Sequence, residues 1–335
     1  MDRIRTRETL LNVHAPAIGA NAAPFRYAFR AMASSHELQL WAASEAHADR
    51  AARVAIADVA RIEAKFTRYR DDSVTSAINR NAGGKPVPID AETASLLRYA
   101  ERCHALSGGR FDLTSGALRR AWDFKRRPAL VPTDDEVAVA RELIGWDRVE
   151  WNDREIRLPI RGMELDFGGI GKEYAADRAA AICSDHGITH GLVNLGGDVR
   201  VIGAQPDGTP WRVGIRHPRE PDAVIGTVEL DDGAVATSGD YERYFVANGR
   251  RYCHLLDART GWPVEHWQSI TVVAPLASLA GSYATIAMLL ARDAPTFLAQ
   301  QDVRHLLVAA DGSIVVNAHP WRAGTAQPVI QRGEA

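Results

Sequence analysis

The stretch from Asp166 to Asp177 contains the residues most suited to binding an anion. It reads Asp-Phe-Gly-Gly-Ile-Gly-Lys-Glu-Tyr-Ala-Ala-Asp, which predicts a strand end, a glycine turn and the first turn of a helix. The N–H groups at a helix N-terminus lack intrahelical partners and carry the positive end of the dipole, and glycines let the backbone approach a phosphate. The stretch therefore predicts a phosphate site, although an ordinary tight strand-to-helix connection has the same pattern.

The same stretch matches neither of two common nucleotide-binding fingerprints. A Walker A loop needs glycine at the position of Asp166 and serine or threonine at the position of Glu173. A dinucleotide-binding run that starts at Gly169 needs glycine at the position of Tyr174. The sequence therefore indicates a phosphate binder of a different kind.

His254 is the candidate for a proton acceptor, because imidazole exchanges a proton near neutral pH. A single histidine on a strand more often has a structural role, so the residue type alone leaves both interpretations open. His186 and His190 are four residues apart, but Gly187 separates them where a helix is expected to end. A two-histidine metal site is therefore the weaker interpretation of that pair.

The composition is that of a soluble globular protein. The 335 residues are 46% hydrophobic, enough for a substantial core, and the formal net charge is -2. Acidic and basic residues are interspersed, so neither nucleic acid nor an anionic membrane surface is an expected partner. The three cysteines, Cys103, Cys183 and Cys253, have no Cys-x-x-Cys spacing, and we expect them to be reduced and structural.

The N-terminal residues mix charges where a signal peptide needs an apolar core, and no lipobox-like cysteine follows them. We therefore expect no membrane anchor and a cytoplasmic location, with an export segment lost through a misassigned start codon as the alternative. Residues 1–24 are expected to be a loosely ordered leader, residues 25–325 a single domain and residues 326–335 a tail.

Helical and strand patterns follow one another in mixed runs along the chain. Helices are expected over residues 45–66, 90–106, 171–185 and 277–291, with another that opens at the capping-box pattern of residues 133–136. Strands are expected over residues 25–30, 36–41, 148–151, 155–158, 191–194, 211–215, 224–230, 243–246 and 269–273. This order predicts an α+β fold with largely antiparallel sheets.

Five sequence blocks together carry a family resemblance. They are residues 111–118, 165–172, 192–198, 235–240 and 251–264, and the last reads Arg-Tyr-Cys-His-Leu-Leu-Asp-Ala-Arg-Thr-Gly-Trp-Pro-Val. In this order they resemble the signature blocks of the ApbE family, the FAD:protein FMN transferases. The resemblance runs from about Met32 to about Leu290. Five blocks in the family's order form a far more specific signal than any one of them.

The resemblance implies an ApbE-like α+β core related to the T-fold, with the flavin in a cleft. It also implies an activity, in which a Thr or Ser hydroxyl of a target flavoprotein attacks the FMN-side phosphorus of FAD. FMN is then attached as a phosphodiester and AMP is released, with Mg²⁺ offsetting charge on the pyrophosphate. Two other functions stay open, an FAD-binding protein with weak or no catalysis and an FAD pyrophosphatase that gives FMN and AMP.

The resemblance also assigns residues to the FAD site. It places Gly168 and Tyr174 at the border of the FAD, Met32 near the flavin and Tyr69 against the ring system. Tyr174 has an alternative role, as a helix-face residue that packs on the core. The resemblance also implies that the consecutive residues Arg110, Phe111 and Asp112 border the ligand and that Asn194, Gly196, Gly197 and Asp198 shape the cleft, with a purely structural turn as the alternative role of the glycines.

The last block favours a catalytic role for His254, because the residues around it match the family's Ser-His-Ile-x-Asp-x-Arg-Thr-Gly pattern. His254 is then the base near the incoming hydroxyl. Cys253 replaces the usual serine of this pattern. A reactive thiol beside the site is one interpretation of that change, and a buried, inert cysteine is the better supported one.

The metal site is where this sequence departs from the family. The resemblance assigns the metal to the carbonyl of Gly171 and to Thr285, but the usual Asp of the family's Ala-Asp-Ala-x-x-Thr block is Gly281 here. Losing the anionic protein ligand should weaken binding of a hard cation such as Mg²⁺. Two compensations are conceivable, more ligands from the FAD pyrophosphate and water, or a carboxylate from Glu173, which replaces a frequent glycine.

Overall fold

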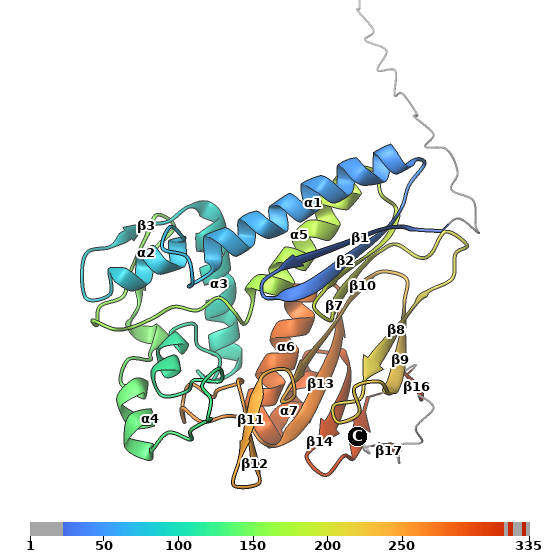
Figure 1. Ribbon diagram of the computed structural model, residues 1–335. Helices are drawn as coiled ribbons and strands as arrows, with labels where there is room; N and C mark the ends of the chain where they lie inside the picture. The colour runs from blue at the N-terminus through green and yellow to red at the C-terminus, as the bar shows by residue number, and fades with distance from the viewer. Residues whose placement is uncertain (1–22, 318–320, 324–329, 333–335) are drawn as a thin grey trace, which may run out of the picture.

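The fold is built on one nine-stranded sheet, seen in a computed structural model that describes residues 23–317, 321–323 and 330–332 (Figure 1). Neighbouring strands are antiparallel except for the final pair, β15 and β17. The strands, in their order across the sheet, are β1 (Phe25–Ala31), β2 (Ser34–Trp41), β6 (His190–Leu195), β7 (Asp198–Ile202), β10 (Gly233–Gly239), β13 (Trp267–Ala274), β14 (Arg304–Ala309), β15 (Ile314–Val316) and β17 (Ile330–Arg332).

Three helices pack together over this sheet: α1 (Glu45–Phe66), α5 (Gly171–Asp185) and α6 (Ala277–Leu290) (Figure 1). Helix α1 lies along α5, α5 contacts α6, and α6 lies over the central strands β10 and β13. Small buried side chains on β10, Ala234 and Ala236, let the helix approach the sheet closely. The main hydrophobic core lies between the helices and the sheet.

Helix α6 begins without a capping side chain of its own. Asp177 on α5 takes that role, because its carboxylate accepts hydrogen bonds from the backbone N–H groups of Ala277 at 2.7 Å and Ser278 at 2.9 Å. A charged acceptor at a helix N-terminus satisfies orphan donors and complements the dipole. The two helices are therefore joined by a polar contact as well as by apolar packing.

The remaining elements form smaller groups around the main sheet. To the left of α5 in Figure 1 lie α2 (Val74–Arg80), α3 (Ala91–Leu106) and a small sheet of β3 (Val87–Pro88), β5 (Glu155–Arg157) and β4 (Glu150–Trp151), with α4 (Asp134–Arg141) below them. The others are β8 (Trp211–Arg216) with β9 (Val224–Leu230) and β16 (Trp321–Ala323), the hairpin β11 (Tyr244–Ala247) and β12 (Arg250–Cys253), and helix α7 (Ala294–Gln300). Short 3-10 turns cover Gly116–Arg120, Trp146–Arg148 and Ala291–Asp293.

The predicted α+β class with largely antiparallel sheets is confirmed. The capping box at Thr133 and Glu136 is formed by both of its hydrogen bonds, and Asp90 caps α3. Helices α2 and α7 were not predicted from the sequence, and neither were the strands β3, β7, β10, β12, β14, β15, β16 and β17. Most of the predicted leader and tail lie outside the described residues. Over the described part of the chain, every helix is too short or too polar to cross a bilayer.

Candidate functional site

The glycine turn leads directly into α5. Asp166 accepts a hydrogen bond from the N–H of Gly168 at 2.9 Å, and the carbonyl of Phe167 accepts one from Gly171 at 2.8 Å. Ile170, at the N-cap position, supplies no capping side chain, so the start of α5 lacks the usual side-chain acceptor. A Cβ added to Gly171 would meet nothing within 4 Å. The turn therefore has the open, uncapped geometry that an anion site needs.

Two turns at one end of the main sheet lie near the start of α5. Met32 is in the β1–β2 turn with φ 47°, and its N–H donates to a Glu63 carboxylate oxygen at 2.6 Å. The β6–β7 turn contains Gly196 with φ 63°, and a Cβ there would lie 2.9 Å from Ser34 Oγ and 3.7 Å from Lys172 Cδ. The predicted flavin neighbour Met32 therefore belongs to the same end of the sheet as the α5 N-terminus.

A buried group of charges lies where α5 meets β7 and α6. Lys172 Nζ lies 2.9 Å from Asp198 Oδ2, which forms an ion pair between α5 and β7. Glu173 is only 8% exposed, and its Oε2 atom has no hydrogen-bond partner. A Cβ added to Gly281 would lie 2.5 Å from Glu173 Cγ and 2.9 Å from Glu173 Oε1. The Glu173 side chain thus occupies the space beside α6 that the glycine leaves free.

The ionisation of this group is strongly perturbed. Burial raises the pKa of Glu173, and the negative charge of Asp198 raises it further. Burial also raises the pKa of Asp198, against the opposing effect of the Lys172 charge. Burial alone would lower the pKa of Lys172, but the two carboxylates outweigh it and raise that pKa. The single positive charge of Lys172 therefore interacts with two buried carboxyl groups.

Thr285 lies one turn after Gly281 on α6, and residues four apart share one face of a helix. Its Oγ1 atom is 2.8 Å from Ser238 Oγ on β10. The Glu173 carboxylate, which comes from α5, packs against Gly281, and Thr285 lies one turn further along α6. Gly171 and Glu173 lie in the first turn of α5, and metal binding by these two residues and Thr285 stays a prediction.

His254 follows directly after β12, and its backbone N–H donates to the carbonyl of Arg243 at 2.9 Å. The ring atom Nδ1 is buried and has no hydrogen-bond partner. Burial lowers the pKa of His254 to about 4, and the charges of Arg243 and Lys172 add to the effect. The imidazole is therefore neutral at pH 7 and able to accept a proton.

Cys253, which precedes His254, is buried, and burial raises the pKa of its thiol to about 11. A thiol with that pKa has almost no thiolate at neutral pH. The structure therefore supports the inert interpretation of Cys253. All three cysteines are free and buried, as expected for structural residues.

Tyr69 has a mostly exposed ring, with 70% of the residue accessible. The guanidinium of Arg68 and the ammonium of Lys125 lie 5.1 Å and 5.3 Å from the ring centre. Arg68 also forms an ion pair with Asp166 at 3.3 Å, which connects the Tyr69 segment to the glycine turn. The ring is therefore available beside the predicted anion site.

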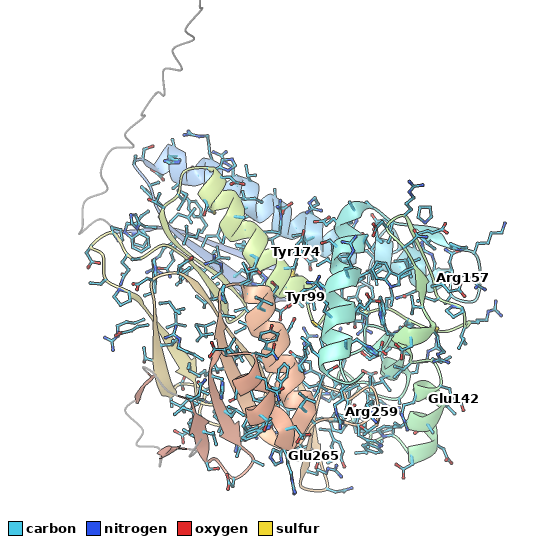
Figure 2. The ribbon with its side chains drawn as sticks, turned by 180° about the vertical axis from the view of Figure 1, so that it is seen from behind. Tyr99, Glu142, Arg157, Tyr174, Arg259 and Glu265 are labelled. Atoms are coloured by element: carbon cyan, nitrogen blue, oxygen red, sulfur yellow. The ribbon has the colours of Figure 1, made fainter. Side chains whose placement is uncertain are left out.

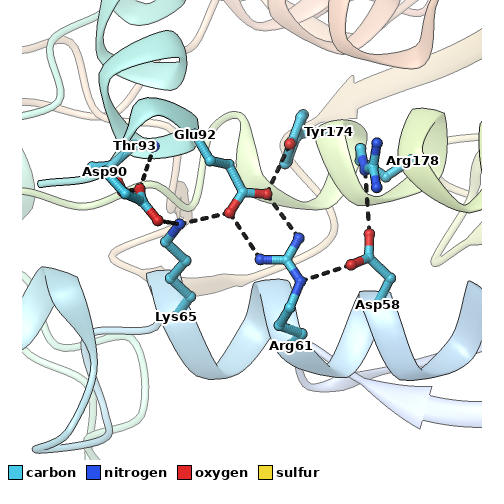
Figure 3. A network of polar contacts seen from close by, with 8 residues as sticks. All are labelled: Asp58, Arg61, Lys65, Asp90, Glu92, Thr93, Tyr174 and Arg178. Carbon is cyan, nitrogen blue, oxygen red and sulfur yellow. Dashed lines mark hydrogen bonds and ion pairs between the residues drawn. The ribbon is translucent and has the colours of Figure 1, made fainter. Parts of the chain in front are cut away.

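Tyr174 is a residue of α5, and its side chain lies between α5 and α3, as Figure 2 shows from the far side of the molecule. Its hydroxyl donates to Glu92 Oε1 at 2.9 Å, and Glu92 also binds Arg61 and Lys65 of α1 (Figure 3). Burial raises the pKa of Tyr174 to about 12, and the hydrogen bond to Glu92 adds to this effect. These contacts fit the alternative role of Tyr174, a helix-face residue, and contact with FAD stays a prediction.

The three consecutive residues Arg110, Phe111 and Asp112 point to different surroundings. Arg110 pairs with Asp257, and both residues line a hollow of about 380 Å³. The ring of Phe111 lies 3.0 Å from the position of a Cβ added to Gly169, so it packs directly against the glycine turn. Asp112 is buried and accepts hydrogen bonds from two backbone N–H groups, those of Thr114 and Trp146. Ligand contact by the three residues remains a prediction.

The structure does not join His186 and His190 into one site. The Nδ1 atom of His186 is 2.8 Å from the Ile182 carbonyl, and that of His190 is 2.7 Å from the Ala204 carbonyl. Nor does the described part of the chain contain a group of three or more His, Cys, Asp or Glu side chains placed to hold a metal. A metal in this protein therefore needs backbone, hydroxyl or substrate oxygens among its ligands.

Comparison with known sequences identifies the family. The sequence profile described as the ApbE family matches residues 32–301, which is most of the chain and includes the glycine turn, His254 and Thr285. The chain belongs to the ApbE family.

Known members of the ApbE family resemble this chain in sequence and structure. The FAD:protein FMN transferase of Vibrio cholerae is 32% identical over 68% of this chain and 70% of its own length, and that of Haemophilus influenzae is 29% identical over 77% and 78%. The crystal structure of the ApbE protein from Thermotoga maritima superposes with a TM-score of 0.80 and 33% identity, covering 87% of this chain and 96% of that one. The apo flavinyl transferase ApbE of Pseudomonas stutzeri gives 0.75 and 26%, covering 88% and 94%.

Sequence reasoning gave no role to two residues of this ApbE site. Lys172 neutralises Asp198, and its charge also acts on His254. Ser238 contacts the hydroxyl of Thr285. Both residues lie inside blocks that carry the family resemblance, so their positions in those blocks were the available signal.

Proposed function

We propose that this protein is an FAD:protein FMN transferase, an enzyme that attaches FMN to a Thr or Ser hydroxyl of a target flavoprotein. The observation that carries the proposal is a combination of three features in a chain of the ApbE family. They are the helix start without a side-chain cap, the neutral His254 and the Lys172–Asp198 ion pair. The curated relatives carry this activity in their names. FAD is a substrate in this reaction.

The start of α5 suits the pyrophosphate of FAD. The open space at Gly171 leaves room for a phosphate, and a helix start without a side-chain cap, with its dipole, favours a negative charge there. Lys172 adds a positive charge in the same turn. Tyr69 offers an exposed aromatic face for the flavin ring.

The reaction exchanges one phosphoester bond for another. The acceptor oxygen forms a bond to the FMN-side phosphorus, and the bond from that phosphorus to the bridging oxygen breaks, so AMP leaves with the oxygen. The hydroxyl proton passes to His254, which is neutral and therefore able to take it. Positioning and charge stabilisation supply most of the catalysis in phosphoryl transfer of this type.

A divalent cation such as Mg²⁺, when bound, would offset the charge that develops on the pyrophosphate. The buried Oε2 atom of Glu173, which has no hydrogen-bond partner within the described part of the chain, supports a role for this carboxylate as a cation ligand. Gly171 and Thr285 would contribute neutral oxygens, a backbone carbonyl and a hydroxyl. The cytoplasmic location expected from the N-terminal residues rests on the sequence alone and is part of this proposal.

The test combines purified protein, FAD, Mg²⁺ and a candidate acceptor domain in one tube. In-gel flavin fluorescence of the denatured acceptor and released AMP are measured together. Acceptor-bound flavin with an equal amount of AMP supports transfer, and the acceptor with its Thr or Ser replaced by Ala should give neither. AMP with free FMN would indicate a pyrophosphatase instead, and bound but intact FAD would indicate a binding protein.

A further inference from the structure

We propose that Glu173 on α5 is the anionic ligand of a divalent-cation site in this protein, and that Gly281 on α6 is the residue that makes room for it. The inference rests on the proposed function only in that the FAD pyrophosphate supplies the remaining anionic oxygens. The cation ligands from the protein are then the Glu173 carboxylate, the Thr285 hydroxyl and the Gly171 carbonyl. They come from the first turn of α5 and one face of α6.

The first argument is steric. A Cβ at position 281 would lie 2.5 Å from Glu173 Cγ, a distance that real Cβ contacts essentially never show. Any side chain at position 281 would therefore displace the Glu173 carboxylate. The two positions compete for one volume, so a carboxylate can enter it from α5 or from α6, but not from both.

The second argument is the unpaired charge. Glu173 is only 8% exposed, and its Oε2 atom has no hydrogen-bond partner among the described residues. Lys172 is engaged by Asp198 at 2.9 Å, so the three charges sum to one net negative charge when both carboxylates are ionised. Leaving a buried carboxylate oxygen without a donor is costly, and such groups call for a missing partner such as an ion.

The third argument is the presence of two other possible oxygen ligands near the Glu173 carboxylate. Gly281 and Thr285 lie on the same face of α6, one turn apart, so the Glu173 carboxylate over Gly281 lies next to the turn that carries Thr285. Gly171 precedes Glu173 by two residues in the same turn of α5, and a Cβ added to it would meet nothing within 4 Å. Carboxylate, hydroxyl and carbonyl oxygens are the ligands that Mg²⁺ and Mn²⁺ accept.

A structural role for Glu173 makes a different prediction. If the side chain served only to fill space beside Gly281, the isosteric Glu173→Gln variant would keep the packing and cation binding would not change. If the side chain is a ligand, removing its charge weakens cation binding. It also removes the buried carboxyl group whose Oε2 atom has no partner in the described part of the cation-free protein.

The experiment measures Mn²⁺ binding by electron paramagnetic resonance in the presence of saturating FAD, together with the thermal midpoint of the cation-free protein. Glu173→Gln is expected to weaken Mn²⁺ binding by about tenfold or more while leaving the midpoint equal or higher. Glu164→Gln is the matched control, because Glu164 is equally buried at 8% but is paired with Arg119 and Arg120. The control should lower the midpoint and leave Mn²⁺ affinity unchanged.

An exchange variant tests the shared volume. Glu173→Gly combined with Gly281→Asp moves the carboxylate from α5 to α6 and should recover most of the Mn²⁺ affinity that Glu173→Gly alone loses. Gly281→Asp alone should lower the thermal midpoint, because its Cβ meets Glu173. Unchanged Mn²⁺ affinity in Glu173→Gln, or no recovery in a folded exchange variant, would overturn the inference.

The outcome for the metal ligand is separate from the outcome for the proposed function. Acceptor-bound flavin formed by the unaltered protein tests the function, whereas Mn²⁺ affinity across the variants tests the ligand. If the protein binds Mn²⁺ through Glu173 but transfers no FMN, the metal-ligand inference is supported and the proposed function is wrong. If the unaltered protein transfers FMN but the Glu173→Gln variant binds Mn²⁺ normally, the proposed function is supported and the metal-ligand inference is wrong.

Discussion

Glu92 connects three helices through one carboxylate, and its removal should destabilise the protein in a pH-dependent way. Arg61 donates to it twice, at 2.7 and 2.8 Å, Lys65 donates at 2.6 Å and Tyr174 at 2.9 Å (Figure 3). The hydrogen bond from Arg61, with smaller contributions from Lys65 and Tyr174, lowers the pKa of Glu92 from 4.5 to about 2. We expect Glu92→Gln to lower the free energy of unfolding at pH 7.

The magnitude follows from the pKa. A change from 4.5 to about 2 corresponds to about 3.4 kcal/mol. Solvent still reaches the side chain, which is 21% exposed, and screening reduces the expected loss to about 1–2 kcal/mol. Because the folded pKa is the lower one, this stabilisation is complete above pH 4.5 and is lost as the pH falls from 4.5 toward 2.

Urea unfolding at pH 7 and at pH 3 measures the effect. At pH 7 the Glu92→Gln variant should lose about 1–2 kcal/mol, and at pH 3 the difference from the unaltered protein should shrink to less than half of that. Glu37→Gln is the control, because the Arg26–Glu37 pair is exposed and should change stability by about 0.5 kcal/mol or less. Equal stability of Glu92→Gln at pH 7, or the same loss at both pH values, would refute the reasoning.

Two further predictions concern the base and the helix junction. Since burial and the charges of Arg243 and Lys172 hold the pKa of His254 near 4, the acid limb of kcat/KM for FAD should lie well below pH 6.5. His254→Asn should lower kcat by about 10²-fold or more, and an acid limb at pH 6.5 or above would contradict the assignment. Asp177→Asn should cost about 1–2 kcal/mol in urea unfolding, because α6 loses its charged cap, and an unchanged midpoint would argue against that cap.

Helix starts could be predicted from the sequence because their signals are local. Thr133 and Glu136 are three residues apart and bond each other's backbone, and Asp90 accepts from the N–H of Thr93 at 2.9 Å. The start of α5 at Gly171 follows from the glycines before it. None of these features depends on a distant part of the chain.

Strand β10 could not be predicted in the same way. Its sequence, Gly-Ala-Val-Ala-Thr-Ser-Gly, is mostly small residues, and only Val235 and Thr237 have an intrinsic preference for a strand. It is a strand because β7 and β13 pair with it on both sides and α6 covers it. Its small side chains are what the close packing of α6 requires, and that requirement appears only in the folded protein.

The candidate site was also only partly predictable. The sequence shows that Gly281 and Glu173 each depart from the family pattern, but it does not show that they touch. Their contact depends on how α5 and α6 cross, which is set by packing and by the Asp177 cap. The unpaired state of Glu173 Oε2 likewise follows from burial among neighbours that lie far away in the sequence.

The Asp177 cap also bears on the entropy of ligand binding. By joining α5 to α6 it fixes the relative position of the two helices that carry Gly171 and Thr285. Groups that are already ordered lose little conformational freedom when a ligand arrives. Tyr69, with its mostly exposed ring, has that freedom still to lose. The entropic cost of binding therefore falls on exposed side chains of this kind rather than on the two helices.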